Sequence, residues 1–260
     1  MKYIVIGLFF IVFLFSGCTN KDVQTPNEKQ TVVVDEKEEE FLSEFDEELK
    51  VEKRIDPLHS YNRVMTNFND GLYEYVVFPV ARVYGDIVHI ELRDGFNNFF
   101  HNILYPVRFV NNILQGKFNN ALDETGRFLV NTTVGFLGMS DQAKDVFHLK
   151  AHDEDFGQTL GYWGVGSGPH IVWPFLGPSN LRDSISFYPD SFLNPVNYVD
   201  NRGYNLVSNS KESFGVNIFD KLNKTSFTYK AYEKIKQDAV DLYPYLRDMY
   251  EQRREKLIKE

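Results

Sequence analysis

The residue that most constrains this chain is Cys18, its only cysteine. A basic start, an apolar run over residues 4–15 and the small pair Ser16-Gly17 precede it. This order is typical of a bacterial lipoprotein signal, which is cut before a cysteine whose thiol is then acylated. The run is shorter than the roughly 20 residues that span a bilayer, which disfavours the alternative of an uncleaved anchor. We therefore expect a signal peptide over 1–17 and a lipid-anchored protein outside the cytoplasm.

The mature chain has to fold without a disulfide, although the periplasm would permit one. About 240 residues remain after cleavage, enough for one large domain with its own core. Phenylalanine is abundant, with 23 residues, and on a lipid-anchored chain this favours membrane contact over a core filled by Phe alone. The net charge of -9, without a dense basic patch, excludes nucleic acid as a partner.

The segment 18–54 is polar and acidic, and we interpret it as a flexible tether. Between Asp35 and Arg54 there are ten acidic and four basic residues, a composition that does not bury enough apolar surface to fold alone. Phe41, Phe45 and Leu49 recur at helical spacing, which is compatible with a short amphipathic helix in part of this segment. A solvated spacer is favoured over a docking site.

Beyond residue 55 the apolar spacing is mostly helical, and no run alternates long enough to build a sheet. We therefore predict an all-α fold, with a core over 55–225 and a C-terminal helix over 226–260. The helical stretches are expected at 62–75, 92–104, 106–114, 118–129 and 229–259. Pro79 is expected to break or kink the segment that contains it, and Pro244 to kink the last helix.

Residues 148–183 differ because they are rich in glycine and carry both tryptophans. We expect loop and short helix here, with Ser179 as a helix N-cap. The Gly164-x-Gly166-x-Gly168 run lacks the strand and helix that a nucleotide loop needs. His152, Asp153 and Asp155 have no second histidine at metal-ligand spacing, and Ser167 lacks a nucleophile elbow. We thus expect no catalytic residue, metal or cofactor.

Several motifs together resemble one known family over about 56–204, and the resemblance weakens after Tyr204. They are Asp56-Pro57-Leu58, Asn111 to Gly116, Arg127 to Gly135, His152 to Gly168, and Leu176 to Ser179 with Leu181-Arg182-Asp183. The sequence is similar to the MlaA family, also called VacJ, of outer-membrane lipoproteins. The long acidic tether and the extended C-terminal helix are departures from the family pattern.

The resemblance implies a ring-like, membrane-embedded helical lipoprotein with a central amphipathic channel, anchored in the periplasmic leaflet of the outer membrane. It implies removal of mislocalised phospholipid from the outer leaflet, which maintains lipid asymmetry. The lipid passes to a soluble periplasmic carrier, the protein binds an outer-membrane porin trimer, and it is not an enzyme.

By the same analogy, residues 184–204 form a non-helical hairpin near the channel mouth, and the first helix lies beside the pore. The candidate channel or gate residues are Asn62, Asn67, Phe68, Asn69, Arg182, Asp183, Pro189 and Pro195. On 118–129, we expect Phe118 and Leu122 to oppose Arg127. The basic residues from Arg253 to Lys259 suit the helix dipole or anionic lipid.

Two other functions remain open from the sequence. The first is an extracytoplasmic lipid hydrolase that uses the His152–Asp155 cluster together with His170. The second is a structural lipoprotein that braces a porin.

Overall fold

The computed structural model describes residues 56–260, so the predicted signal peptide, the acylated Cys18 and the tether lie outside the described residues. Helices dominate these residues, as expected for an all-α chain. They are α3 (His59–Leu72), the π-helical turn η2 (Tyr73–Val77), α4 (Phe78–Ile87), α5 (Ile90–Ile103), α6 (Tyr105–Leu114), α7 (Phe118–Thr133), α8 (Gln142–Asp145), α9 (Phe156–Tyr162), α10 (Leu181–Leu193), α11 (Ser210–Asp238) and α12 (Leu242–Lys259). The strands are β1 (His170–Trp173) and β2 (Gly177–Asn180).

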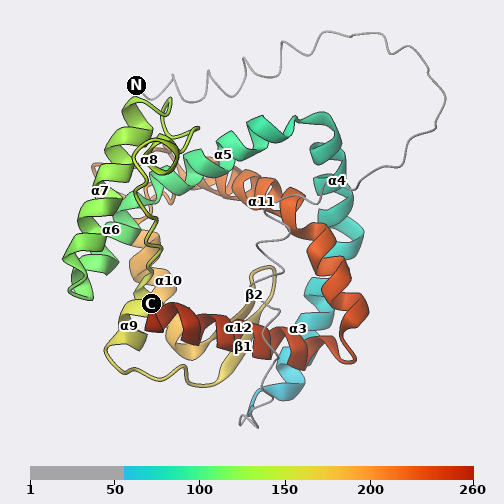
Figure 1. Cartoon of the computed structure of the whole chain (residues 1–260). Coiled ribbons are helices and arrows are strands. Elements are labelled where there is room, and N and C mark those ends of the chain that lie inside the picture. The colour runs from blue at the N-terminus through green and yellow to red at the C-terminus, as the bar shows by residue number, and fades with distance from the viewer. Residues whose placement is uncertain (1–55) are drawn as a thin grey trace, which may run out of the picture.

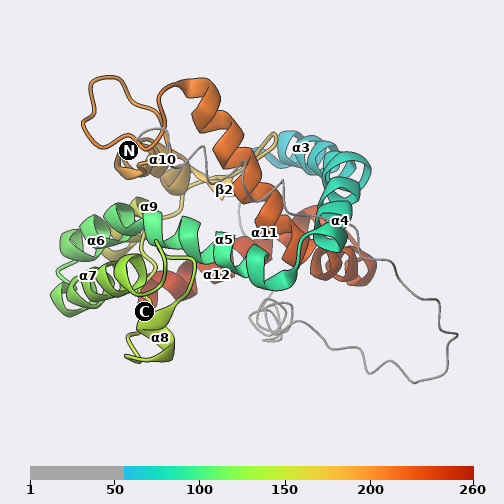
Figure 2. The ribbon, with the colours of Figure 1, turned by 90° about the horizontal axis from the view of Figure 1, so that it is seen from above.

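The helices follow one another around a ring (Figure 1). From α3 and α4 the chain runs through α5 to α6, α7, α9 and α10 on the opposite side, α11 then leads back along α5 and α4, and α12 runs from α3 to α9. Helix α11 lies against α4 and α5 (Figure 2). The ring closes where α12 meets α3: Asn62 Nδ2 donates to Tyr243 Oη at 3.1 Å, and Arg63 pairs with Asp241 at 2.6 Å.

Pro79 and Pro244 act differently from the prediction. Pro79 does not end the helix, because it lies in the first turn of α4, directly after the π-helical turn. The wider π-turn rearranges the backbone hydrogen bonds at the point where proline lacks a donor. Pro106 does open α6, as expected. The C-terminal run breaks at residues 239–241 rather than kinking at Pro244, which occupies the first turn of α12 and needs no N–H there.

The glycine-rich segment contains a small sheet that was not predicted. Strands β1 and β2 pair antiparallel, with His170 opposite Asn180. Each has only four residues, too few to show an alternating pattern. The N-cap of α10 is Asn180, whose side chain accepts from the Asp183 N–H at 2.8 Å, and not the expected Ser179.

The expected non-helical hairpin over 184–204 is wrong for its first half, because α10 continues to Leu193 with Pro189 inside it. Proline normally breaks a helix interior. Here buried contacts of Asp183 and Asp190, on either side of Pro189, hold the helix in place. Residues 194–204 are irregular, as predicted.

Candidate functional site

In residues 56–260, many polar side chains are buried and many large apolar side chains are exposed, which is the reverse of the usual distribution. Among their buried side chains, 25 are polar or charged and 13 are apolar, while 37 large apolar side chains are exposed. Water-soluble domains bury mainly apolar residues, so the distribution in this part of the chain departs from theirs.

Helix α7 shows the reversal clearly. Phe118, Leu122 and Leu129 are 61%, 68% and 56% exposed, whereas Glu124 and Arg127 are buried. The predicted apolar stripe therefore exists, and it faces outward. Helix α12 is the contrast, because its exposed side chains are all charged. The apolar exterior thus belongs to particular helices.

From residue 56 to 260, no helix has an apolar stretch of the length that a bilayer crossing requires.

Two of the candidate channel residues fasten the β-hairpin to α3. Asn62 donates to the His170 carbonyl at 2.9 Å and accepts from the Val172 N–H at 2.9 Å. Two turns further on, Asn69 donates to the Trp173 carbonyl and accepts from the Phe175 N–H. Each amide replaces a strand partner for the edge of β1. The other two candidates on α3, Asn67 and Phe68, are exposed.

Arg182 and Asp183 belong instead to a buried ion network at the junction of α9, α10 and α12. Arg254 donates to both oxygens of Asp155, at 2.6 and 2.8 Å, and pairs with Asp183 at 2.8 Å. Tyr250 donates to Asp183 at 2.7 Å. Burial opposes ionisation, but the charge of Arg254 and the hydrogen bonds from these partners lower the pKa of Asp183.

Glycine is required at position 157, where this network touches the first turn of α9. A Cβ there would lie 2.4 Å from Asp183 Oδ1 and 2.6 Å from an Arg254 nitrogen. The remaining candidates are Pro189, which lies inside α10, and Pro195, which is buried just beyond it. Four of the eight candidates thus take part in two polar assemblies, at the β-hairpin and at the ion network.

A second buried ion pair joins α6 to α7. Arg108 donates to Glu124 at 2.6 Å, and Glu124, which is fully buried, also accepts from the His152 N–H at 2.8 Å. Nearby, His101 contacts Asp153 at 2.8 Å. The hydrogen bond from His101 and the neighbouring charges of Arg108 and Arg127 lower the pKa of the exposed Asp153 to about 2.

The side chains of the proposed hydrolase are each engaged separately. His152 contacts Asp123 at 3.2 Å, while His170 pairs with the buried Glu251 at 2.8 Å, on the strand side of the molecule. Glu154 binds Lys117 at 2.6 Å. Within residues 56–260, no three His, Cys, Asp or Glu side chains gather as metal ligands would.

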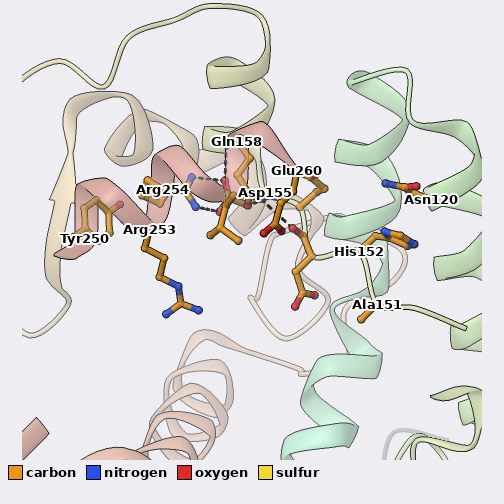
Figure 3. A pocket seen from close by; sticks show the side chains of 12 residues that line it. Asn120, Ala151, His152, Asp155, Gln158, Tyr250, Arg253, Arg254 and Glu260 are labelled. Carbon is orange, nitrogen blue, oxygen red and sulfur yellow. Dashed lines mark hydrogen bonds and ion pairs between the residues drawn. The ribbon is translucent and has the colours of Figure 1, made fainter. Parts of the chain in front are cut away.

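A cavity of about 530 Å³ lies between α12, α9 and the segment that leads into α9. Figure 3 shows Tyr250, Arg253 and Arg254 on α12, with His152 and Asp155 across from them. Its volume falls within the roughly 300–1,000 Å³ usual for ligand sites. Polar and charged side chains make up most of its lining.

The comparison with known families decides what this ring is. Residues 54–257 match the model of the MlaA lipoprotein family. The chain belongs to the MlaA lipoprotein family. This confirms the resemblance found in the sequence, and it extends the match past Tyr204 through α12.

The chain is also similar to individual proteins and to a solved structure. It is 38% identical to the intermembrane phospholipid transport system lipoprotein MlaA of Escherichia coli, over 54% of this chain and 57% of that protein. An uncharacterized protein of Rickettsia bellii is 31% identical, over 77% of this chain and 75% of that protein. A solved structure described as the structural basis for maintenance of bacterial outer membrane lipid asymmetry superposes with a TM-score of 0.67 at 28% identity. It covers 79% of this chain and all of its own.

Sequence reasoning missed the main polar residues of this MlaA protein. Glu124 was not singled out, and Arg254 was assigned to the helix dipole or to anionic lipid rather than to Asp155, 99 positions away. A charged residue on the polar face of a predicted helix was the available signal. That signal does not identify a distant partner.

The pKa of Asp190 leads to a prediction of how the free energy of unfolding depends on pH. Burial and the charge of Asp155 raise its pKa to about 6, against roughly 3.9 in the unfolded chain. Because the folded state holds this proton more tightly, the free energy of unfolding falls as pH rises from about 4 to about 6. Asp190→Asn keeps an acceptor for the Phe156 N–H and is expected to gain about 1–2 kcal/mol relative to wild type over that interval.

Urea unfolding in detergent micelles at pH 4, 5, 6 and 7 measures the effect. The same change at exposed Asp238 is the control and is expected to leave the pH profile as it is. Parallel profiles for Asp190→Asn and wild type would show that Asp190 does not hold a proton in this range.

Proposed function

We propose that this chain is the outer-membrane lipoprotein that removes mislocalised phospholipid from the outer leaflet and passes it to a soluble periplasmic carrier. The names of the curated MlaA relatives support phospholipid transport between membranes. The observation that carries the proposal is the reversed polarity of the protein, in which many large apolar side chains are exposed and many polar side chains are buried.

The energetics favour such a device over unaided lipid extraction. Each buried CH₂ is worth about 0.8 kcal/mol, so two acyl chains of roughly 16 carbons resist transfer into water by something like 25 kcal/mol. A protein that offers apolar surface to the tails and a polar path to the headgroup lowers this barrier without cleaving any bond. We propose that the ring encloses an amphipathic channel of this kind.

The exposed side chains support a position within one leaflet of the bilayer. Leaving a Leu, Phe or Val in water rather than burying it costs about 1.5–3 kcal/mol, and many such side chains lie on α4 and α7. An acyl chain on Cys18 would hold the ring in the periplasmic leaflet, with residues 18–54 as its tether. The core over 55–225 and the C-terminal segment 226–260 would then form the ring together.

The partners and the gate follow from the same proposal. An outer-membrane porin trimer gives the ring access to the outer leaflet, and a soluble carrier receives the lipid. Residues 184–204 act as the gate. Several exposed apolar side chains of α10 support this, among them Ile185 at 59% and Tyr188 at 81%.

We infer that the chain is not an enzyme. The engagement of His152, Glu154 and His170 in separate ion pairs argues against a hydrolase centre. Bracing of a porin alone does not explain why the ring buries so many polar groups. Phospholipid transport accounts for both observations.

A deletion strain tests the proposed function. Loss of the gene is expected to raise the phospholipid content of the outer leaflet, and the wild-type chain is expected to restore it without releasing free fatty acid from labelled phospholipid. Photo-crosslinkers along 62–72 and 184–204 should yield lipid adducts. Normal asymmetry in the deletion strain would favour bracing, and released fatty acid would favour a hydrolase.

A further inference from the structure

The cavity beside α12 differs from the apolar exterior in the chemistry of its lining. Four carboxylate side chains line it, those of Asp153, Glu154, Asp155 and Glu260, against two guanidinium groups, Arg253 and Arg254. Leu257 is its one large aliphatic side chain. The lining thus carries charges of both signs, to which a small charged group can bind.

The positions of these charges are set by the buried networks around them. Asp155 and Asp183 hold Arg254 from two sides. Lys117 neutralises Glu154. Asp153 stays exposed on the cavity, with its carboxylate 2.8 Å from His101 and 3.6 Å from Arg108. These partners keep Asp153 ionised, and its exposed carboxylate can accept hydrogen bonds from the cavity side.

We propose that this cavity holds the zwitterionic headgroup of a phospholipid, with the ammonium towards Asp153 and Glu260 and the phosphate towards Arg253. The inference rests on the proposed function and adds the lipid class. A headgroup that carries a positive and a negative charge matches a cavity that is lined by groups of both charges. A purely anionic headgroup such as glycerol phosphate leaves the two carboxylates without a partner and is repelled by them.

Cross-linking in a mixed bilayer tests the inference on the full-length protein. The protein is reconstituted in nanodiscs of equal phosphatidylethanolamine and phosphatidylglycerol, with p-benzoylphenylalanine at position 257, inside the cavity, or at position 118, on the apolar exterior. We expect adducts at 118 to follow the bilayer composition. At 257 we expect phosphatidylethanolamine to be enriched about three- to fivefold, the effect of one water-accessible ion pair.

Two variants examine the carboxylates, and a third is the control. Glu260→Gln and Asp153→Asn are each expected to reduce the enrichment at 257 towards the bilayer ratio. Glu260 is exposed, so its variant is expected to keep the melting temperature even if Asp153→Asn perturbs His101 and Arg108. Lys256→Gln lies on the same helix outside the cavity lining and should leave the enrichment unchanged.

The outcomes separate the two proposals. Adducts at 257 in the bilayer ratio, or an enrichment that survives both carboxylate variants, would overturn headgroup binding in the cavity. Adducts at 118 with none at 257 would also overturn it and leave phospholipid transport intact. An absence of lipid adducts at both positions would overturn the proposed function itself.

Discussion

Replacing Arg254 by methionine is expected to lower the free energy of unfolding by about 3–5 kcal/mol, because two carboxylates would lose the cation they share. Asp183 is 4% exposed in its side chain, and Asp155 36%. The methionine fills much of the arginine volume, so the loss reports charge rather than a void. In a chain of this length the change corresponds to a fall in melting temperature of about 6–20 °C, measurable by circular dichroism in detergent micelles.

Two further variants make the Arg254 result specific. Lys256→Met removes a cation from an exposed position on the same helix and is expected to shift stability by no more than about 0.5 kcal/mol. Adding Asp183→Asn to Arg254→Met should recover part of the loss, since one buried charge then disappears. Equal melting temperatures for Arg254→Met and wild type would contradict the network described above.

Placing glutamates at Leu122 and Leu129, on the outer face of α7, is expected to abolish function while leaving the fold stable in micelles. In a water-exposed protein both changes would be nearly neutral, because the side chains are 68% and 56% exposed. In contact with acyl chains each charge costs about 2.5–3.5 kcal/mol. The double variant should therefore fail to restore lipid asymmetry in the deletion strain.

A charge reversal at Lys230 serves as the matched control for the α7 variant. Lys230 is exposed on α11 and apart from the apolar face, so Lys230→Glu should complement the deletion strain like wild type. Labelling with phospholipid that carries a photoreactive acyl chain adds a direct measurement. We expect the α7 double variant to lose label and Lys230→Glu to keep it. Full complementation by the double variant would contradict lipid contact along α7.

The helices of the ring were largely predictable from local pattern. The stretches expected at 92–104, 106–114 and 118–129 correspond to α5, α6 and α7, because each carries an apolar stripe with a helical period and a proline or polar start. The sequence did not show whether each apolar stripe faces the interior of the protein or its exterior. Phe118 and Leu122 have the same spacing whether the helix faces a core or a bilayer, so exposure depends on the surrounding helices.

The polar positions were the harder part, since their roles depend on distant partners. Asn62 was assigned to the channel by analogy, yet it bonds to β1, 108 positions away. A polar residue on a helix face looks alike in sequence whether it meets water or the edge of a strand. The strands themselves, four residues each, are too short for periodicity to reveal.

The meeting of α3 and α12 has a consequence for biogenesis. Native closure joins positions 181 apart, Asn62 and Tyr243, so it has to wait until almost the whole polypeptide has emerged on the far side of the inner membrane. Contacts between residues so far apart in the sequence form slowly. Until they form, the apolar helix faces are open to self-association. A translational stop at or before codon 241 would remove both Asp241 and Tyr243, and periplasmic chaperones and proteases would encounter the open ring first.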